Sequence, residues 1–120
     1  KMAGVNKPID ELDLIQVHDL ITGTEILAYE ELGLCDIGQG GRLVDEGVTE
    51  RNGKVPANVD GGRIACGHVG GVSGAYGACE IVRQLREEAG ERQIRVKSGR
   101  GVMQCIDGHG SMSSVTVFER

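Results

Sequence analysis

The segment Gly61-Gly62-Arg63-Ile64-Ala65-Cys66-Gly67-His68-Val69-Gly70-Gly71-Val72-Ser73-Gly74 sets one histidine among several glycines, directly before a helical pattern. Glycine has no side chain and tolerates positive φ, so such a loop lets the backbone approach a ligand closely. The start of a helix adds free N–H groups and a positive dipole end, which suit an anion or a developing oxyanion. In that setting His68 is placed for acid–base chemistry near neutral pH. The alternative is that the glycines serve only tight packing and that His68 is a surface residue.

The bulk composition limits the class of protein. A chain of 120 residues predicts one domain with a real core, and a formal net charge of -5 without a long basic run argues against nucleic-acid binding. No apolar stretch approaches the roughly 20 residues needed to span a membrane and no signal-peptide pattern opens the chain, so we expect a cytoplasmic protein. The cysteines form no Cys-x-x-Cys pair, which argues against a metal site and a disulfide framework; they are Cys35, Cys66, Cys79 and Cys105.

Upstream of the glycine loop, residues 12–17 form a nearly continuous apolar run that predicts a buried strand ending at His18-Asp19. Thr22 and Glu25 have capping-box spacing, and the helix that follows should end near Gly33. Residues 34–58 are rich in turn residues and predict a surface excursion, with one helical turn over residues 42–46. Residues 55–59 form a short extended piece that leads into the glycine loop.

Downstream of the loop, a helix is predicted from Ser73 to a stop at Gly90. Its first half is small on every face, so we expect its start to be central and its end exposed. Residues 93–97, 102–106 and 115–118 have the alternation and β-branched content of strands. The order of elements predicts a mixed α/β sheet with helices on at least one face. The apolar positions at helical spacing are Ala75, Ala78, Cys79, Val82 and Leu85.

Four short motifs occur in a fixed order along the chain. They are Val17-His18-Asp19, Asn58-Val59-Asp60-Gly61-Gly62, Gly67-His68 and Gln84-Leu85-Arg86. With these motifs, essentially the whole chain resembles the C-terminal half of the thiolase superfamily. The resemblance implies one domain over residues 1–120, an α/β half with a mixed sheet of about five strands, helices packed on the sheet and one small-residue helix at the centre. Because the chain starts at Lys1 and not at a methionine, we expect it to be a piece of a longer protein that lacks the N-terminal half.

The resemblance also implies site residues. His18 and Asp19 match a His-Asp motif that helps form an oxyanion pocket. His68, after Gly67, matches a histidine that activates the nucleophile and binds the thioester oxygen. The acyl-accepting cysteine lies in the N-terminal half of this family, so no cysteine of this chain takes that role. Cys105 is instead the candidate for a second acid–base cysteine. Candidates for substrate contact are Asp19, Gly67, Gly108 and His109.

The sequence departs from the family pattern at three places. Val69 stands where proline is usual, and Leu20-Ile21 replaces a small-then-aromatic pair that shapes the acyl pocket. The glycine after Cys105 arrives one residue late, at Gly108, and another register puts Asp107 at the cysteine position. We favour Cys105; the alternative is a buried strand cysteine that behaves as a small hydrophobe. For His109 the alternative is an exposed loop histidine.

The resulting hypothesis is the C-terminal catalytic half of an acetyl-CoA acetyltransferase-like acyltransferase of lipid metabolism. It would carry out 3-ketoacyl-CoA thiolysis or the reverse Claisen condensation, with coenzyme A as substrate and no other cofactor, and would be inactive without the N-terminal half. The alternative is a non-catalytic acyl-CoA-binding or dimerisation module, against which the presence of both His18 and His68 argues. A nucleotide-binding loop is disfavoured because the phosphate-binding glycine motifs are absent. An uncovered apolar face predicts a partner chain or a homo-oligomer.

Four arginines raise the question of a phosphate site: Arg63, Arg83, Arg86 and Arg92. The simpler interpretation is that they are helix-surface residues that pair with Glu87 or Glu88.

Overall fold

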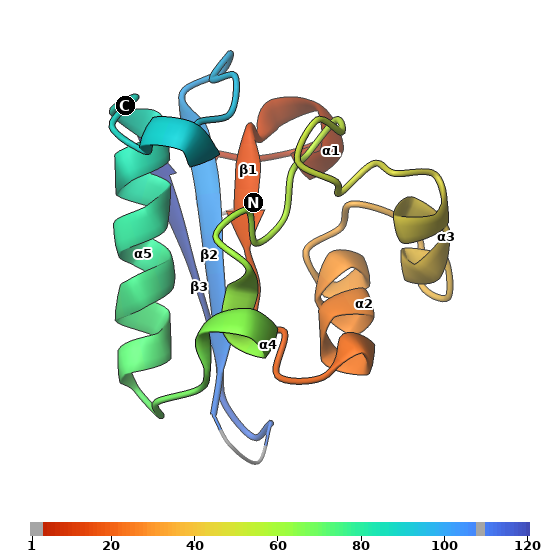
Figure 1. The fold of residues 1–120 in the computed structure, drawn as a ribbon. Coiled ribbons are helices and arrows are strands. Elements are labelled where there is room, and N and C mark those ends of the chain that lie inside the picture. The colour runs from red at the N-terminus through yellow and green to blue at the C-terminus, as the bar shows by residue number, and fades with distance from the viewer. Residues whose placement is uncertain (1–3, 108–109) are drawn as a thin grey trace.

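The computed structural model describes residues 4–107 and 110–120, and a three-stranded mixed sheet lies at the centre of these residues (Figure 1). Strand β1 (Leu14–Gln16) pairs in parallel with β2 (Arg100–Ile106), which pairs antiparallel with β3 (Ser113–Glu119). Val102 sits opposite Ile15 on one side and Val117 on the other. The mixed α/β class is therefore confirmed, with strands in the regions predicted at 12–17, 102–106 and 115–118.

The described residues contain fewer strands than the predicted count of about five, and the strand expected over residues 93–97 is absent from them. Its backbone donors bind side chains in place of a neighbouring strand. The N–H of Ile94 donates to Gln84 Oε1 at 2.9 Å, and the N–H of Lys97 donates to Asp13 Oδ1 at 2.9 Å. The extended piece at 55–59 contributes one isolated parallel bridge, between Ala57 and Ile15.

Helices cover both faces of the sheet (Figure 1). Helix α5 (Val72–Leu85) covers one face. Its residues Ile81 and Leu85 pack against Leu14 of β1 and against Ile94. Helix α2 (Thr22–Glu31) lies on the other side. Consecutive strand residues point to opposite faces, so β1 is buried on both, as its apolar run predicts. The core on the α2 side consists of Leu12, Ile15, Val17, Ala28, Tyr29, Leu34, Val55 and Val102.

The prediction that α5 has a buried start and an exposed end is wrong, because the structure shows the reverse. Most of its buried residues lie in the second half, whereas Val72 at its start is 61% exposed. The second half is held by polar contacts: buried Glu80 accepts a hydrogen bond from Gln84 Nε2 at 2.9 Å and forms an ion pair with Arg92 Nη2 at 3.0 Å. The small residues on the opposite side are left without a covering layer, and Ala75 and Cys79 are exposed.

Helix boundaries differ from the predictions in two places. At the start of α2, Thr24 Oγ1 accepts a hydrogen bond from the Ile21 N–H at 3.4 Å, so this interaction involves Thr24 and not the predicted Thr22. Helix α5 ends at Leu85, well before Gly90. The end of α2 before Gly33, which has φ of +72°, is confirmed. The remaining helices are short: α1 (Pro8–Glu11), α3 (Gly40–Asp45) at the predicted helical turn, α4 (Gly62–Cys66) and the 3₁₀ turn η1 (Gly90–Arg92).

The arginine prediction is partly wrong. Arg92 pairs with Glu80, and Glu87 pairs with Arg120 at 2.8 Å. Arg63 is buried and belongs to the site described below. Among the helices of the described residues, none has the length and apolar character to cross a membrane.

Candidate active site

The two predicted site histidines meet beyond the carboxyl end of β1. His18 follows this strand and is buried, whereas His68 is exposed in the turn between α4 and α5. Their ring centroids are 4.9 Å apart and the ring planes are almost perpendicular, at 85°. The structure therefore brings together two histidines that lie fifty residues apart in the chain.

Side chains from two other segments hold the end of β1 that carries His18. The His18 N–H donates to Gln104 Oε1 at 3.0 Å, and the Val17 N–H donates to Asn58 Oδ1 at 2.9 Å. Asn58 has φ of +46°, a conformation that asparagine tolerates better than most residues. The motif around Asn58 thus serves to fix the backbone beside the histidine.

Ser73, in the first turn of α5, orients His68. Its Oγ lies 3.1 Å from His68 Nδ1 and accepts a hydrogen bond from the Val69 N–H at 3.1 Å. A hydroxyl is both donor and acceptor, so Ser73 can hydrogen-bond to Nδ1 in either tautomer of the imidazole. The Nε2 atom of His68 is therefore able to accept a proton in one tautomer and to donate a hydrogen bond in the other.

Cys105 joins the two histidines from β2. Its Sγ lies 3.8 Å from His18 Nδ1. Helix α5 approaches this sulfur closely because Gly74 has no side chain: a Cβ there would lie 3.3 Å from Sγ. The thiol is half-buried and faces an imidazole, an environment in which proton exchange between the two groups is geometrically available.

A cleft of about 520 Å³ opens beside these residues. One wall contains the glycines at the start of α5, where the dipole of the helix has its positive end. The opposite wall comes from β2, from the residues between β2 and β3, and from the start of β3. The lining residues that matter for the chemistry are His68, Gly74, Met103, Cys105 and Ser114.

Asp19 and Gly67 have supporting positions. Asp19 is buried, and its Oδ1 accepts the Arg63 N–H at 2.6 Å, which fixes the start of α4. Gly67 ends α4 with φ of +84° and turns the chain toward His68. Contact of these residues with substrate stays a prediction. Gly108 and His109 lie outside the described residues.

The burial of Arg63 differs from the predicted helix-surface position, because arginine is normally exposed. Its Nη2 lies 3.3 Å from Asp60 Oδ2, and its guanidinium carbon lies 4.3 Å from the centre of the Tyr76 ring. Asp60 also accepts a hydrogen bond from Gln16 Nε2 at 2.9 Å. The three-residue spacing of Asp60 and Arg63 was the available signal for this pair. Ser73 and Gln104 were missed because neither residue type is diagnostic of a site by itself.

The environment of His18 lowers its pKa below 6.5. Burial is the largest cause, and the nearby His68 and Arg63 act in the same direction, while Asp19 opposes them. Unfolded His18 takes up a proton as the pH falls through about 6.5, whereas folded His18 stays neutral to lower pH. The free energy of unfolding should therefore decrease as the pH falls from about 6.5 toward the folded pKa.

Urea unfolding at a series of pH values between about 7.5 and 5 tests this prediction. His18→Asn should remove the His18 part of the decrease, whatever its effect on stability at neutral pH. An NMR titration in which the folded His18 ring protonates at or above pH 6.5 would contradict it.

The fold and the paired histidines describe an α/β unit with a candidate acid–base site, and comparison with known proteins assigns the family. The chain belongs to the thiolase C-terminal domain-like family, which it matches over residues 1–120.

Curated relatives share this segment. The acetyl-CoA acetyltransferase of Methanothermobacter thermautotrophicus is 41% identical over 110 residues, which are 92% of this chain and 28% of that protein. Sterol carrier protein 2 of Rattus norvegicus is 42% identical over 108 residues, which are 90% of this chain and 19% of that protein. This chain thus spans less than a third of the length of either relative.

A solved structure has the same fold. The Ltp2-ChsH2(DUF35) aldolase matches with a TM-score of 0.74 and 22% sequence identity, over 95% of this chain and 28% of that chain.

Proposed function

We propose that this chain is the C-terminal half of a thiolase-like acyl-CoA acyltransferase and supplies its acid–base groups. The observation that carries the proposal is the edge-to-face contact of His18 and His68 at 4.9 Å, with the thiol of Cys105 3.8 Å from His18. The acyl-accepting cysteine belongs to an N-terminal half. The family and the acetyl-CoA acetyltransferase relatives support the class of reaction.

His68 takes the thiol proton of the nucleophilic cysteine, and the resulting thiolate attacks the thioester carbonyl. The protonated imidazole donates a hydrogen bond to the oxyanion that forms. When the oxyanion collapses, CoA leaves as a thiolate and takes the proton from His68, and the acyl group remains on the nucleophilic cysteine. His18 has a lowered pKa, so it is neutral at pH 7 and acts as a second polar group beside the same oxygen. One fixed oxyanion donor contributes roughly 10²–10³ in rate.

Cys105 exchanges the second proton. In the condensation direction its thiolate removes a proton from the α-carbon of the second acyl group, and in thiolysis its thiol returns one. His18 Nδ1 is the neighbouring group that shares this proton. Asp107, the other residue considered for this role, has both carboxylate oxygens hydrogen-bonded to Ser111, at 2.8 and 2.6 Å.

Thiolysis of acetoacetyl-CoA by the full-length protein tests the assignment. Cys105→Ser should lower kcat/KM by about 100-fold or more, because general acid–base groups contribute 10²–10⁴. Asp107→Asn is the matched control and should stay within about threefold. The reverse order of effects would assign the role to Asp107.

The competing function is a non-catalytic acyl-CoA-binding or dimerisation module. The uncovered apolar side of α5, with Ala75 and Cys79 exposed, favours a partner chain or self-association in either case. Full-length protein that binds acyl-CoA by calorimetry but cleaves no 3-ketoacyl-CoA, whatever the acyl length, would support the module and overturn the enzyme.

A further inference from the structure

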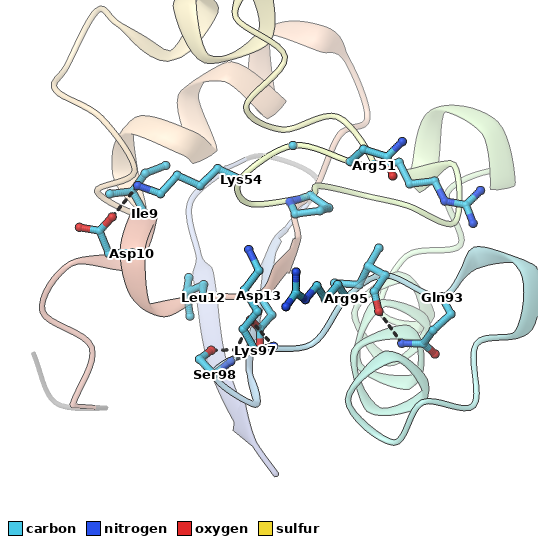
Figure 2. A pocket seen from close by; sticks show the side chains of 14 residues that line it. Ile9, Asp10, Leu12, Asp13, Arg51, Lys54, Gln93, Arg95, Lys97 and Ser98 are labelled. Atoms are coloured by element: carbon cyan, nitrogen blue, oxygen red, sulfur yellow. Dashed lines mark hydrogen bonds and ion pairs between the residues drawn. The ribbon is translucent and has the colours of Figure 1, made fainter.

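A second cleft lies at the opposite end of β1 from the histidines. It has a volume of about 370 Å³ and separates the loop at residues 51–56 from the segment at residues 93–98 (Figure 2). Its floor is apolar, with Leu12, Pro56 and Ile94 buried beneath it. The residues that precede β1 complete the lining, so the cleft has no residue in common with the cleft beside His68.

The rim of this cleft is cationic although the chain as a whole carries a net charge of -5. Four basic side chains line it, against the two carboxylates Asp10 and Asp13; the four are Arg51, Lys54, Arg95 and Lys97.

Two of these four cations are already engaged. Lys54 forms an ion pair with Asp10 at 2.5 Å, and Arg51 donates to the backbone carbonyl of Glu91. Arg95 and Lys97 are exposed, and their side chains make no hydrogen bond or ion pair within residues 4–107 and 110–120. Figure 2 shows both beside the gap between the two segments, with Lys54 turned toward Asp10.

The backbone that carries Arg95 and Lys97 is fixed at both ends. At one end, the Ile94 N–H donates to Gln84 Oε1 at 2.9 Å, and Gln84 is fully buried. At the other end, the carboxylate of Asp13 accepts the N–H groups of Lys97 and Ser98 at 2.9 and 3.0 Å and of Gly99 at 2.7 Å. Asp13 thereby holds this backbone from beneath the cleft, and among residues 4–107 and 110–120 its carboxylate forms no ion pair with Arg95 or Lys97.

The two cations also share one side of this segment. Ile94 and Val96 pack into the core on the α5 side, and residues two apart on an extended backbone point the same way. Arg95 and Lys97 therefore lie on the same side of the segment, and neither forms an ion pair among residues 4–107 and 110–120, so both are available to an anion in the cleft. Charge-assisted hydrogen bonds to a phosphate satisfy both groups.

We propose that this cleft binds a small organic phosphate, with the phosphate between Arg95 and Lys97 and the apolar part of the ligand over Leu12, Pro56 and Ile94. The site is separate from the acyl-transfer site, because it lies beyond the other end of β1. Ligand binding there does not depend on the proposed enzymatic function.

Calorimetric titration of the full-length protein with inorganic phosphate and with phenyl phosphate tests the proposal. Both should bind saturably, and phenyl phosphate should bind about fivefold or more tightly because its ring covers the apolar floor. The double variant R95Q/K97Q should weaken both by about tenfold or more, and added salt should weaken the wild-type protein.

The matched control is R83Q/R86Q, which removes the same charge from exposed positions at and just after the end of α5 and should change binding by less than about twofold. Equal weakening in both double variants, or no saturable binding of either phosphate to the wild type, would overturn the site. If a poly-glutamate peptide binds and neither phosphate does, the proposal of a small phosphate ligand is contradicted, and the result favours an acidic protein partner. Acetoacetyl-CoA thiolysis by R95Q/K97Q should equal that of the wild type, which separates this test from that of the acyltransferase.

Discussion

His68→Ala in the full-length protein is expected to lower kcat/KM for acetoacetyl-CoA thiolysis by about 10³-fold or more. The variant loses both the group that takes the thiol proton and a donor to the oxyanion. The first contribution is worth roughly 10²–10⁴ and the second roughly 10²–10³. His68→Asn keeps an amide near Ser73 Oγ but has no acid–base group, so it should recover little of the activity. The measurement is steady-state thiolysis, with the initial rate followed over a range of substrate concentrations.

The control for this prediction is the stability of the His68→Ala variant. His68 is exposed, so His68→Ala should change the free energy of unfolding by no more than about 0.5 kcal/mol. Ser73→Ala removes the hydroxyl that orients the ring and should lower kcat/KM by a smaller factor, about tenfold, with a shifted pH profile. Full activity in His68→Ala would exclude the imidazole from the chemistry.

Gly62→Ala is expected to destabilise the fold by about 3 kcal/mol. A Cβ at this position would lie 1.9 Å from Asp19 Oδ2, and Gly62 has φ of +62°. The left-handed conformation costs an alanine roughly 1–2 kcal/mol. Displacing the Asp19 carboxylate from the buried Arg63 N–H adds roughly 1–3 kcal/mol. Thermal unfolding of the variant should show Tm lowered by about 10 °C or more.

Gly71→Ala is the matched control for this glycine. Gly71 has φ of -60°, and a Cβ there meets no atom within 4 Å. The free energy of unfolding of Gly71→Ala should therefore stay within about 0.5 kcal/mol of the wild-type value. If Gly62→Ala were as stable as Gly71→Ala, the close approach of Asp19 to α4 would not exist in solution.

The sequence predicted those parts of the fold that follow from local pattern. The apolar run before His18 became β1, which is buried on both faces, and the β-branched stretches near the C-terminus became β2 and β3. The strand predicted at residues 93–97 failed for a reason that no local pattern contains. Its alternation is real, with Ile94 and Val96 turned inward, but its backbone donors bind Gln84 and Asp13 from distant segments.

The candidate site likewise contains residues that the sequence predicted and residues that it did not. His18, His68 and Cys105 were named from the sequence because they fall in recognisable motifs, and the structure brings them together. The groups that hold them in place were not predicted. Ser73 and Gln104 are ordinary residue types whose roles depend on tertiary contacts. The burial of Glu80 on α5 was missed because a charged side chain normally faces water.

The pairing of β1 with β2 has a consequence for how the chain folds. Leu14, close to the start, aligns with Gly101, close to the end, so the parallel ladder closes a loop that contains almost every other element. Contacts between residues so distant in sequence slow folding, because the intervening chain must be ordered before they form. On a ribosome β1 cannot form this pairing until the residues of β2 have been synthesised. During that interval its apolar side chains are exposed to chaperones and to aggregation.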